Sequence, residues 1–217
     1  MAYCIRWIST VGFCLSIGTA IGQQAKPSKP PTIVQPGAPG KRSTTVSPAI
    51  AAASNPKLAD ADVNFMQGMI HHHAQAVEMV DLLRTRGASR DLQTFGERIT
   101  ISQSDEIKYM KQWLEERGKP VSIGHQHEGH LMPMPMMPGM LTPQQMETLA
   151  KAKGAEFDRL FLTGMIQHHD GALTMVQELF DTPGAGQDAA LYDFATDIDN
   201  TQRAEIEIMR GMLKEKK

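Results

Sequence analysis

Hydrophobic residues recur along the middle of the chain at the spacing of packed helices. A first helix is expected from about Ala59 to Arg86, where Gly87 ends it. Its core-facing positions follow at intervals of four, three, four, three and four residues: Phe65, Met69, His72, Ala76, Met79 and Leu83. These intervals place side chains on one face of an α-helix. No alternating pattern typical of a strand competes with this interpretation.

A second helix is expected from about Ser89 to Arg117, because Gly118 and Pro120 stop it. Its core-facing positions have the same spacing: Ile99, Gln103, Glu106, Met110 and Trp113. The two helices therefore form a hairpin with one apolar face.

The second half of the domain repeats this arrangement. Thr142 followed by Pro143 predicts a helix start. A short helix leads into a long one that ends near Phe180, with a jog at Gly154. A last helix is expected from about Asp188 to Lys214. Its core-facing positions are Ile198, Gln202, Glu205, Met209 and Met212.

The two halves are copies of one another. Met69–Val80 reads MIHHHAQAVEMV and Met165–Val176 reads MIQHHDGALTMV, and they align without a gap at an offset of 96 residues. The partner helices align at an offset of 99 through the pairs Gln103/Gln202, Glu106/Glu205, Ile107/Ile206, Met110/Met209 and Leu114/Leu213. Two hairpins with one apolar face each are expected to bury those faces together. The sequence predicts an all-α, four-helix bundle built from two duplicated hairpins, with each hairpin a working unit.

The first residues, 1–22, have the features of a secretory signal peptide. Arg6 supplies the positive start, Trp7–Ile21 is mostly apolar, and Ala20-Ile21-Gly22 offers a small-residue cleavage site. The apolar stretch is too short to span a membrane, so we expect no membrane anchor after cleavage. Residues 23–57 are rich in Pro, Ser, Thr, Ala and Gly and predict a disordered tether.

The remaining residues are enough for one domain with a core. Cys4 and Cys14 leave with the signal peptide, so a metal site in the mature domain must use His, Met, Gln or carboxylate side chains. The net charge of −2 comes with no basic patch for nucleic acid and no long charge run. The domain divides into a first hairpin at 58–118, a connector at 119–141 and a second hairpin at 142–217.

Histidine occupies core-facing positions in both copies. His72 and its copy His168 lie in the seams, and Met69 and His73 share one side of the first helix. A core that contains imidazole and thioether groups is costly unless those groups are used, so we favour metal ligation. The alternative is a structural polar layer in which side chains of the partner helix bond the histidines.

Two glutamates are expected beside these histidines. Glu106 and Glu205 occupy core-facing positions on the partner helices, and Gln103 and Gln202 lie one turn away. A buried carboxylate needs a partner, so we expect each glutamate to accept an N–H from a ligating imidazole and fix its tautomer. They are alternatively direct ligands of a harder metal. A di-iron oxidase would need Glu-x-x-His motifs, which neither half contains.

The connector carries a second group of candidate metal ligands. Prolines at 133, 135 and 138 exclude a helix, so its methionines cannot form a helical core stripe and are expected to lie exposed, outside the core. Thioethers select Cu(I) or Ag(I), whereas imidazoles suit Cu(II) and zinc. The alternative is a methionine-rich spacer of low complexity. The candidate ligands are His125, His127, His130, Met132, Met134, Met136, Met137 and Met140.

Each copy has the motif Phe-x3-Met-Ile-x-His-His-x2-Ala followed by Gln-x2-Glu-Ile-x2-Met, starting at Phe65 and Gln103 and again at Phe161 and Gln202. This doubled motif, with the connector Met-Pro-Gly-Met-Leu-Thr-Pro, resembles the "domain of unknown function 305" family over about Asp60 to Leu213. The resemblance implies a ferritin-like four-helix bundle, secreted or periplasmic, with some members linked to copper binding and copper tolerance. The ligands implied by position are Met69, His72, His73, Met79, Met165, His168, His169 and Met175.

Together these features predict an exported, non-enzymatic metal-binding protein. Copper, as Cu(I) or Cu(II), is the expected ion, with silver or zinc as alternatives, and the expected partners are the ion and other copper-handling proteins of the cell envelope. Two other classes stay open, a metal-dependent oxidoreductase that uses the core His and Glu residues and a structural bundle without metal. The sequence sets no oligomeric state.

Overall fold

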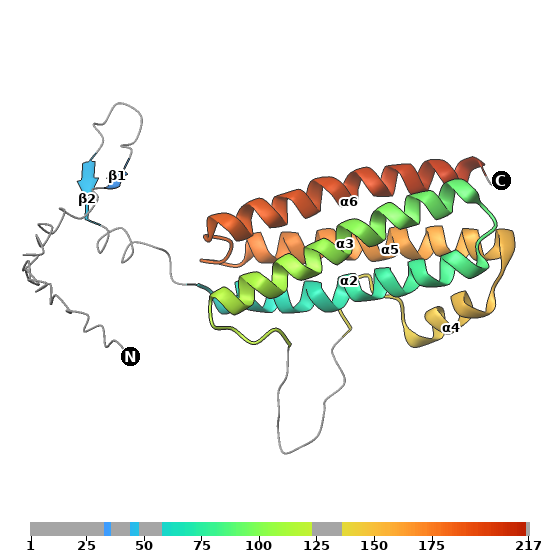
Figure 1. Cartoon of the computed structure of the whole chain (residues 1–217), viewed down its shortest axis with the longest axis horizontal. Helices are drawn as coiled ribbons and strands as arrows, with labels where there is room; N and C mark the ends of the chain where they lie inside the picture. The colour runs from blue at the N-terminus through green and yellow to red at the C-terminus, as the bar shows by residue number, and fades with distance from the viewer. Residues whose placement is uncertain (1–32, 36–43, 48–57, 123–135, 216–217) are drawn as a thin grey trace, which may run out of the picture. The chain divides into compact units, whose positions relative to one another are not determined.

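The computed structural model describes residues 33–35, 44–47, 58–122 and 136–215. Four long helices run side by side, and a short helix lies next to one of them (Figure 1). The predicted all-α, four-helix bundle is confirmed. The helices are α2 (Asp60–Arg86), α3 (Arg90–Glu116), α4 (Pro143–Lys151), α5 (Gly154–Asp181) and α6 (Ala189–Glu215).

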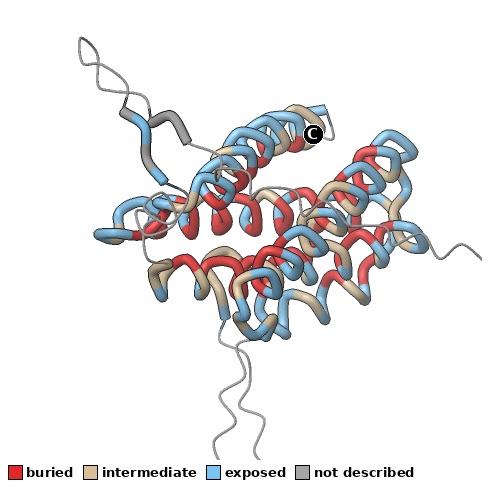
Figure 2. Tube along the Cα trace, turned by 60° about the vertical axis from the view of Figure 1, so that its left-hand side comes forward, coloured by how far each residue is buried: buried red, intermediate tan, exposed pale blue. Residues whose placement is uncertain are grey.

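The two helices that carry the His-Met repeat, α2 and α5, pack against each other at the centre of the bundle. Helix α3 packs on α2, and α6 packs on α5. Figure 2 shows that the buried positions follow the inner faces of the helices. All six predicted core-facing positions of the first helix are at most 6% exposed. The deepest part of the bundle is therefore the contact between the two copies.

The helix ends follow the expected local chemistry. The Thr142 side chain accepts the backbone N–H of Gln145 at 3.2 Å, and the Gln145 side chain accepts the N–H of Thr142 at 2.8 Å, which closes a capping box at the start of α4. The predicted jog at Gly154 is confirmed, because α4 ends at Lys151 and α5 begins at Gly154, whose φ is 62°. A positive φ favours glycine there.

The described residues before Ser54 belong to a different unit from the bundle, whose unit is Asn55–Lys217. The predicted signal peptide lies outside the described residues. Within the expected disordered tether, the structure describes two antiparallel strands, β1 (Ile33–Gln35) and β2 (Thr44–Val46). Their β-branched side chains favour extended backbone, which explains this local difference. No helix of the described residues is long and apolar enough to cross a membrane.

Two buried aspartates fasten each copy to the loop of the other. Asp62, near the start of α2, accepts the backbone N–H of Gly186 at 2.7 Å. Asp158 is its counterpart on α5 at the offset of 96, and it accepts the N–H groups of Ala88 and Ser89, both at 3.0 Å. These hydrogen bonds join the hairpins reciprocally at opposite ends of the central helix pair.

We expect Asp158→Asn to destabilise the protein by about 2 kcal/mol, because Asn has one acceptor oxygen in place of two and leaves a backbone N–H without a charged acceptor. The measurement is the free energy of unfolding by denaturant. Asp197→Asn, at an exposed position of α6, is the matched control and should change stability by less than about 0.5 kcal/mol. Equal stability of the two variants would contradict this role for Asp158.

Candidate metal centre

His72 and His168 meet at the centre of the bundle. Their ring centroids lie 3.8 Å apart, and both side chains are fully buried. The Nε2 of His72 lies 3.0 Å from the carbonyl oxygen of Pro138, and the Nε2 of His168 lies 2.9 Å from the carbonyl oxygen of His72. A carbonyl oxygen can only accept, so each Nε2 must carry the hydrogen. The tautomer of both imidazoles is thereby set.

The second histidine of each copy is held by a glutamate. His73 Nε2 lies 2.7 Å from Glu106 Oε2, and His169 Nε2 lies 2.7 Å from Glu205 Oε2. Burial raises the pKa of Glu106, but hydrogen bonds from His73 and from Ser102 outweigh it and hold the pKa below its ordinary value. The Glu106 carboxylate therefore accepts, and His73 donates through Nε2. The predicted placement of both glutamates beside the histidines is confirmed.

The remaining nitrogen of all four imidazoles is buried and has no hydrogen-bond partner among the described residues. These atoms are the Nδ1 of His72, His73, His168 and His169. In the neutral form of an imidazole held in this way, Nε2 carries the hydrogen and Nδ1 presents a lone pair. The side-chain amides of Gln103 and Gln202 are likewise buried and unpartnered. Four histidines and two glutamines therefore have buried side-chain atoms that could form hydrogen bonds and have no partner among the described residues.

Burial keeps the central histidines neutral. It lowers the pKa of His72 from its ordinary 6.5 to about 3, and repulsion between His72 and His73 when both are protonated adds to this effect. Burial, together with repulsion between the two rings when both are protonated, also holds the pKa of His168 well below its ordinary value. At neutral pH both rings are therefore in the form that binds a metal, because a ligating imidazole must be unprotonated at the ligating nitrogen.

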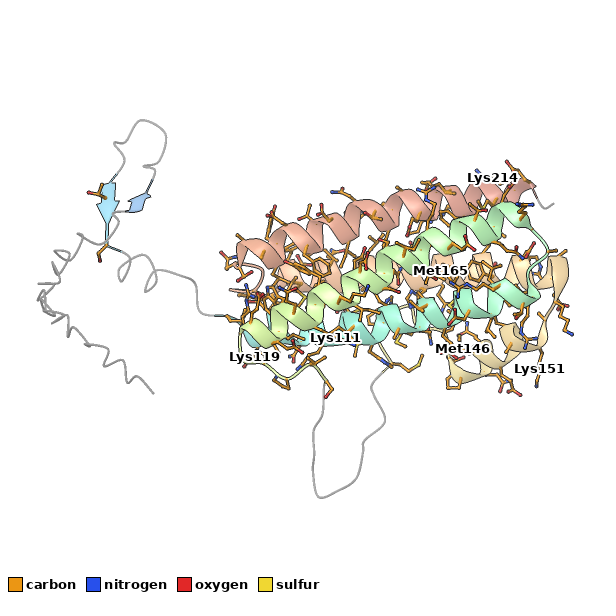
Figure 3. The ribbon with its side chains drawn as sticks, viewed as in Figure 1. Lys111, Lys119, Met146, Lys151, Met165 and Lys214 are labelled. Atoms are coloured by element: carbon orange, nitrogen blue, oxygen red, sulfur yellow. The ribbon has the colours of Figure 1, made fainter. Side chains whose placement is uncertain are left out.

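The four repeated methionines lie in the core on both sides of the histidine layer. Met79 and Met165 belong to one cluster of buried side chains, and Met69 and Met175 belong to another. Met165, labelled in Figure 3, is fully buried. Each cluster contains one of these four repeated methionines from each copy. The thioethers are therefore shared between the hairpins.

This arrangement corrects one sequence-based interpretation. The hairpin is a unit for the His73–Glu106 and His169–Glu205 pairs. It is not the unit for His72 and His168, which contact each other across the copies. Hydrophobic periodicity identifies the face that a side chain buries, but it does not say which buried face lies opposite.

Imidazoles and carboxylates alone do not form a metal cage here. Among the described residues, no group of three or more His, Cys, Asp or Glu side chains could hold a metal ion. The other buried donor atoms in this part of the core include the imidazole Nδ1 atoms and the methionine sulfurs. Such a mixed set of neutral ligands suits a soft ion such as Cu(I) or Ag(I) better than a hard one.

The end of the connector is docked on the bundle. The candidates His125, His127, His130, Met132 and Met134 lie outside the described residues. Met136 is 52% exposed, as a connector methionine is expected to be, but Met140 is only 6% exposed. The prediction that the connector methionines lie outside the core is therefore wrong for Met140, because a non-helical segment can also bury side chains when its backbone finds partners.

Those partners come from α2 and α5. The Gln75 side chain donates to the carbonyl oxygen of Leu141 at 2.9 Å and accepts the N–H of Leu141 at 2.7 Å. Gln167 donates to the carbonyl oxygen of Gly139 at 3.2 Å. The backbone of Pro138 and Gly139 lies directly on Gly171, where no Cβ would fit. The role of Gln75 and Gly171 in holding the connector could not be predicted from the repeat. The two residues occupy equivalent positions of the two copies, but their side chains differ.

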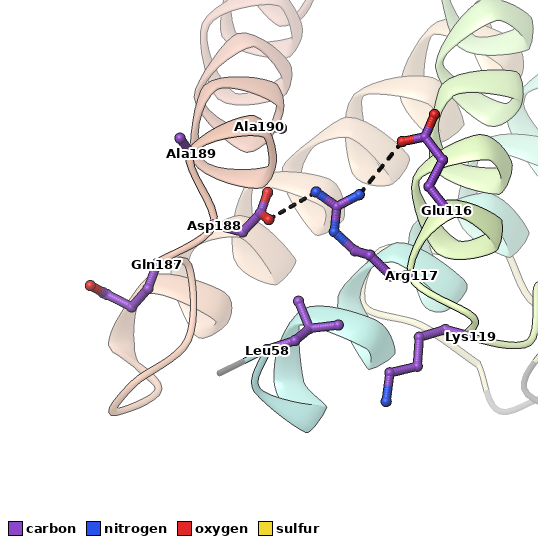
Figure 4. Close-up of a pocket in the computed structure, with 8 residues that line it drawn as sticks. All are labelled: Leu58, Glu116, Arg117, Lys119, Gln187, Asp188, Ala189 and Ala190. Atoms are coloured by element: carbon purple, nitrogen blue, oxygen red, sulfur yellow. Dashed lines mark hydrogen bonds and ion pairs between the residues drawn. The ribbon is translucent and has the colours of Figure 1, made fainter. Parts of the chain in front are cut away.

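Another cavity lies where α3 ends and α6 begins, with a volume of about 830 Å³ (Figure 4). Arg117 bonds Asp188 at 2.8 Å, lies 3.8 Å from Glu116, and stacks over the Trp113 ring at 4.2 Å. These charges are matched to one another, so this region is a structural clasp between α3 and α6.

The structure places the protein in the class of duplicated four-helix bundles whose core contains His and Met residues from both halves. The chain belongs to the family described as Domain of unknown function (DUF305), whose model matches residues 62–213. The family resemblance predicted from the repeated motif is confirmed. No curated protein matches the chain.

Solved structures of relatives share the fold. A DUF305 protein from Streptomyces coelicolor is 27% identical with a TM-score of 0.63, and the match covers 72% of this chain and 93% of the Streptomyces chain. A DUF305 fragment from Deinococcus radiodurans is 27% identical with a TM-score of 0.62, and covers 74% and 99%. CopM in its Cu(II)-bound form is 28% identical with a TM-score of 0.55, and covers 71% and 96%. CopM has also been solved in Cu(I)-bound and silver-bound forms.

Proposed function

We propose that this protein binds copper in the cell envelope and buffers, sequesters or transfers it, with silver as a second soft ion that it accepts. The observation that carries the proposal is the set of four buried Nδ1 atoms without partners. A buried polar group left unpaired costs about 1–3 kcal/mol. Four such atoms in one layer are a large cost for a purely structural core, and a bound metal ion would remove it.

The partners of the opposite nitrogen support the same role. Proteins commonly fix a ligating histidine by giving its other N–H a carboxylate or carbonyl acceptor. His73 and His169 have glutamate acceptors, and His72 and His168 have carbonyl acceptors. In this proposal, Nδ1 atoms and the sulfurs of Met69, Met79 and Met165 hold the ion, which remains cargo and undergoes no chemistry.

Copper rather than zinc is favoured by the ligand types. Thioether sulfur is a weak ligand for zinc and a good one for Cu(I). CopM, to which the chain is similar, has been solved with Cu(I), Cu(II) and silver bound. A signal-like sequence over residues 1–22 supports a role outside the cytoplasm.

The proposal is tested by competition for Cu(I) between the mature protein and a coloured Cu(I) chelator. We expect the protein to withdraw Cu(I) from the chelator. The double variant His73→Gln with His169→Gln should lose at least about tenfold in affinity, or about 1.4 kcal/mol, because two imidazole donors are gone. The matched control is His71→Gln, which introduces the residue that the second copy has at the equivalent position, Gln167.

Wild-type protein that takes no Cu(I) from the chelator would contradict the proposal. Equal affinity of the double variant and wild type would refute the role of these histidines. Oxygen consumption is followed in the same samples, because copper-dependent turnover would favour the oxidoreductase alternative.

A further inference from the structure

Two glycines, one in each copy, form matching cradles on the central helices. Gly68 precedes Met69 on α2, and Gly164 precedes Met165 on α5, at the same offset of 96. A Cβ at Gly164 would lie 3.3 Å from Met79 Cε, and a Cβ at Gly68 would lie 3.3 Å from Met175 Cε. Each glycine thus receives the methyl end of the repeated methionine from the opposite copy.

The docked end of the connector completes both cradles, but with different residues. At Gly164 it supplies Leu141, whose Cδ2 would lie 3.0 Å from an added Cβ. At Gly68 it supplies Met137, whose Sδ would lie 3.3 Å from an added Cβ. One cradle therefore holds a methionine and a leucine, whereas the other holds two methionines.

The leucine in the first cradle shows what packing alone requires. An aliphatic side chain fills that position in the same fold. Methionine is the more flexible residue and specifies a packed position less firmly. A second methionine at Gly68 therefore needs another explanation, and a second thioether sulfur is the one property that leucine cannot supply.

The two-methionine cradle also opens to solvent. A cavity of about 250 Å³ lies beside it, lined by Met137 and Met175 together with Phe65, Asn64 and Glu178. Met175 is 6% exposed and Met137 is half-buried. The cavity is large enough for an ion with part of its hydration shell, because one water occupies about 30 Å³ in the liquid. The Glu178 carboxylate adds a negative charge that favours a cation.

We infer that Met137 and Met175 form an outer binding site for a soft monovalent cation, Cu(I) or Ag(I), at the Gly68 cradle. The inference rests on the proposed function and adds a site distinct from the buried histidine layer. Met137 is joined directly to Pro138, whose carbonyl oxygen accepts the N–H of His72. The outer site is therefore one residue from the group that sets the tautomer of the central imidazole.

The test uses mature protein labelled with ¹³C at the methionine methyl groups and titrated with Ag(I). The signals of Met137 and Met175 are assigned through Met137→Leu and Met175→Leu, which nearly conserve side-chain volume. We expect both signals to shift in the same step of the titration. In Met137→Leu, the Met175 shift should disappear and the bound silver should fall by one ion, whereas the core methionines should respond as in wild type.

Two further variants make the test specific. Met146→Leu changes a methionine of α4 outside the cradle and should leave the number of bound ions unchanged. Leu141→Met gives the Gly164 cradle the same two thioethers and should add one silver ion. Thermal unfolding of each variant shows that it remains folded.

The outcomes separate the outer site from the proposed function. If other methionine signals shift while those of Met137 and Met175 do not, the outer site is refuted and soft-metal binding stands. If no methionine signal shifts and no silver binds, both are refuted. Wild-type silver stoichiometry in Met137→Leu also overturns the outer site.

Discussion

Lowering the pH from 6.5 toward 3 is expected to destabilise the bundle steeply in the absence of metal. In the folded state the pKa of His72 is about 3, and the pKa of His168 is also well below 6.5. In the unfolded state both histidines take up a proton near their ordinary pKa of about 6.5. Between these values the unfolded chain binds more protons than the folded one, so stability falls as the pH falls.

The expected size of this effect is about 1.4 kcal/mol per pH unit for each of the two histidines. Above pH 6.5 both are neutral in both states, and their contribution no longer changes. Glu106 acts in a lower window, because its pKa is held below the ordinary 4.5 and its stabilisation is lost as the pH falls below that value. The interval from pH 6.5 to 4.5 therefore isolates the histidines.

Denaturant unfolding at several pH values in this interval measures the effect. The double variant His72→Gln with His168→Gln has no titrating group at either position, so its free energy of unfolding should change much less with pH. His71→Gln, at a half-buried neighbouring position, should retain most of the wild-type slope. A wild-type stability that stays constant from pH 6.5 to 4.5 would contradict the buried, neutral state of the central pair.

Replacing Gly171 with alanine is expected to release the docked end of the connector. A Cβ at this position of α5 would overlap the carbonyl oxygen of Pro138. Neither backbone can move aside without breaking the hydrogen bonds of Gln75 and Gln167 to the segment. Movement of Pro138 would also leave His72 Nε2 without its acceptor. We expect a loss of about 3–5 kcal/mol from overpacking and the unpaired donor together.

The matched control for this substitution is Gly211→Ala on α6, where an added Cβ would meet nothing within 4 Å. Alanine favours helix over glycine by about 1 kcal/mol, so this variant should be neutral or slightly stabilised. Denaturant unfolding compares the two, and limited proteolysis follows exposure of residues 136–141. Equal stability of Gly171→Ala and wild type would show that the contact with Pro138 does not hold the segment.

The fold could be predicted because its determinants are local and repeated. The spacing of Phe65, Met69 and His72 identifies the buried face of α2, and Thr142 identifies the start of α4 by its capping chemistry. The offset of 96 then shows that the same hairpin occurs twice. The contacts of Glu106 and Glu205 with histidines could be predicted from this pattern, because a histidine and a carboxylate on the facing sides of one hairpin are neighbours in the core.

The rest of the site depends on contacts that no periodicity encodes. The stacking of His72 on His168 follows from the crossing of α2 and α5. The burial of Met140 follows from hydrogen bonds between Gln75 and the backbone of Leu141, and the counterpart of Gln75 in the second copy is a glycine, Gly171. The roles of Gly68 and Asp158 were open to prediction, because both repeat at the offset of 96, but glycine and aspartate at helix positions carry no ligand signature of their own.

The central proposal is that the unpartnered Nδ1 atoms of the core histidines bind a soft metal while Nε2 keeps its hydrogen. Nitrogen-15 NMR of the histidine side chains, recorded before and after addition of one soft ion such as Ag(I), tests it most directly. We predict that core Nδ1 resonances shift on binding and that the Nε2–H groups facing Glu106 and Glu205 stay protonated. Core Nδ1 resonances that remain unchanged in silver-saturated protein would contradict the claim.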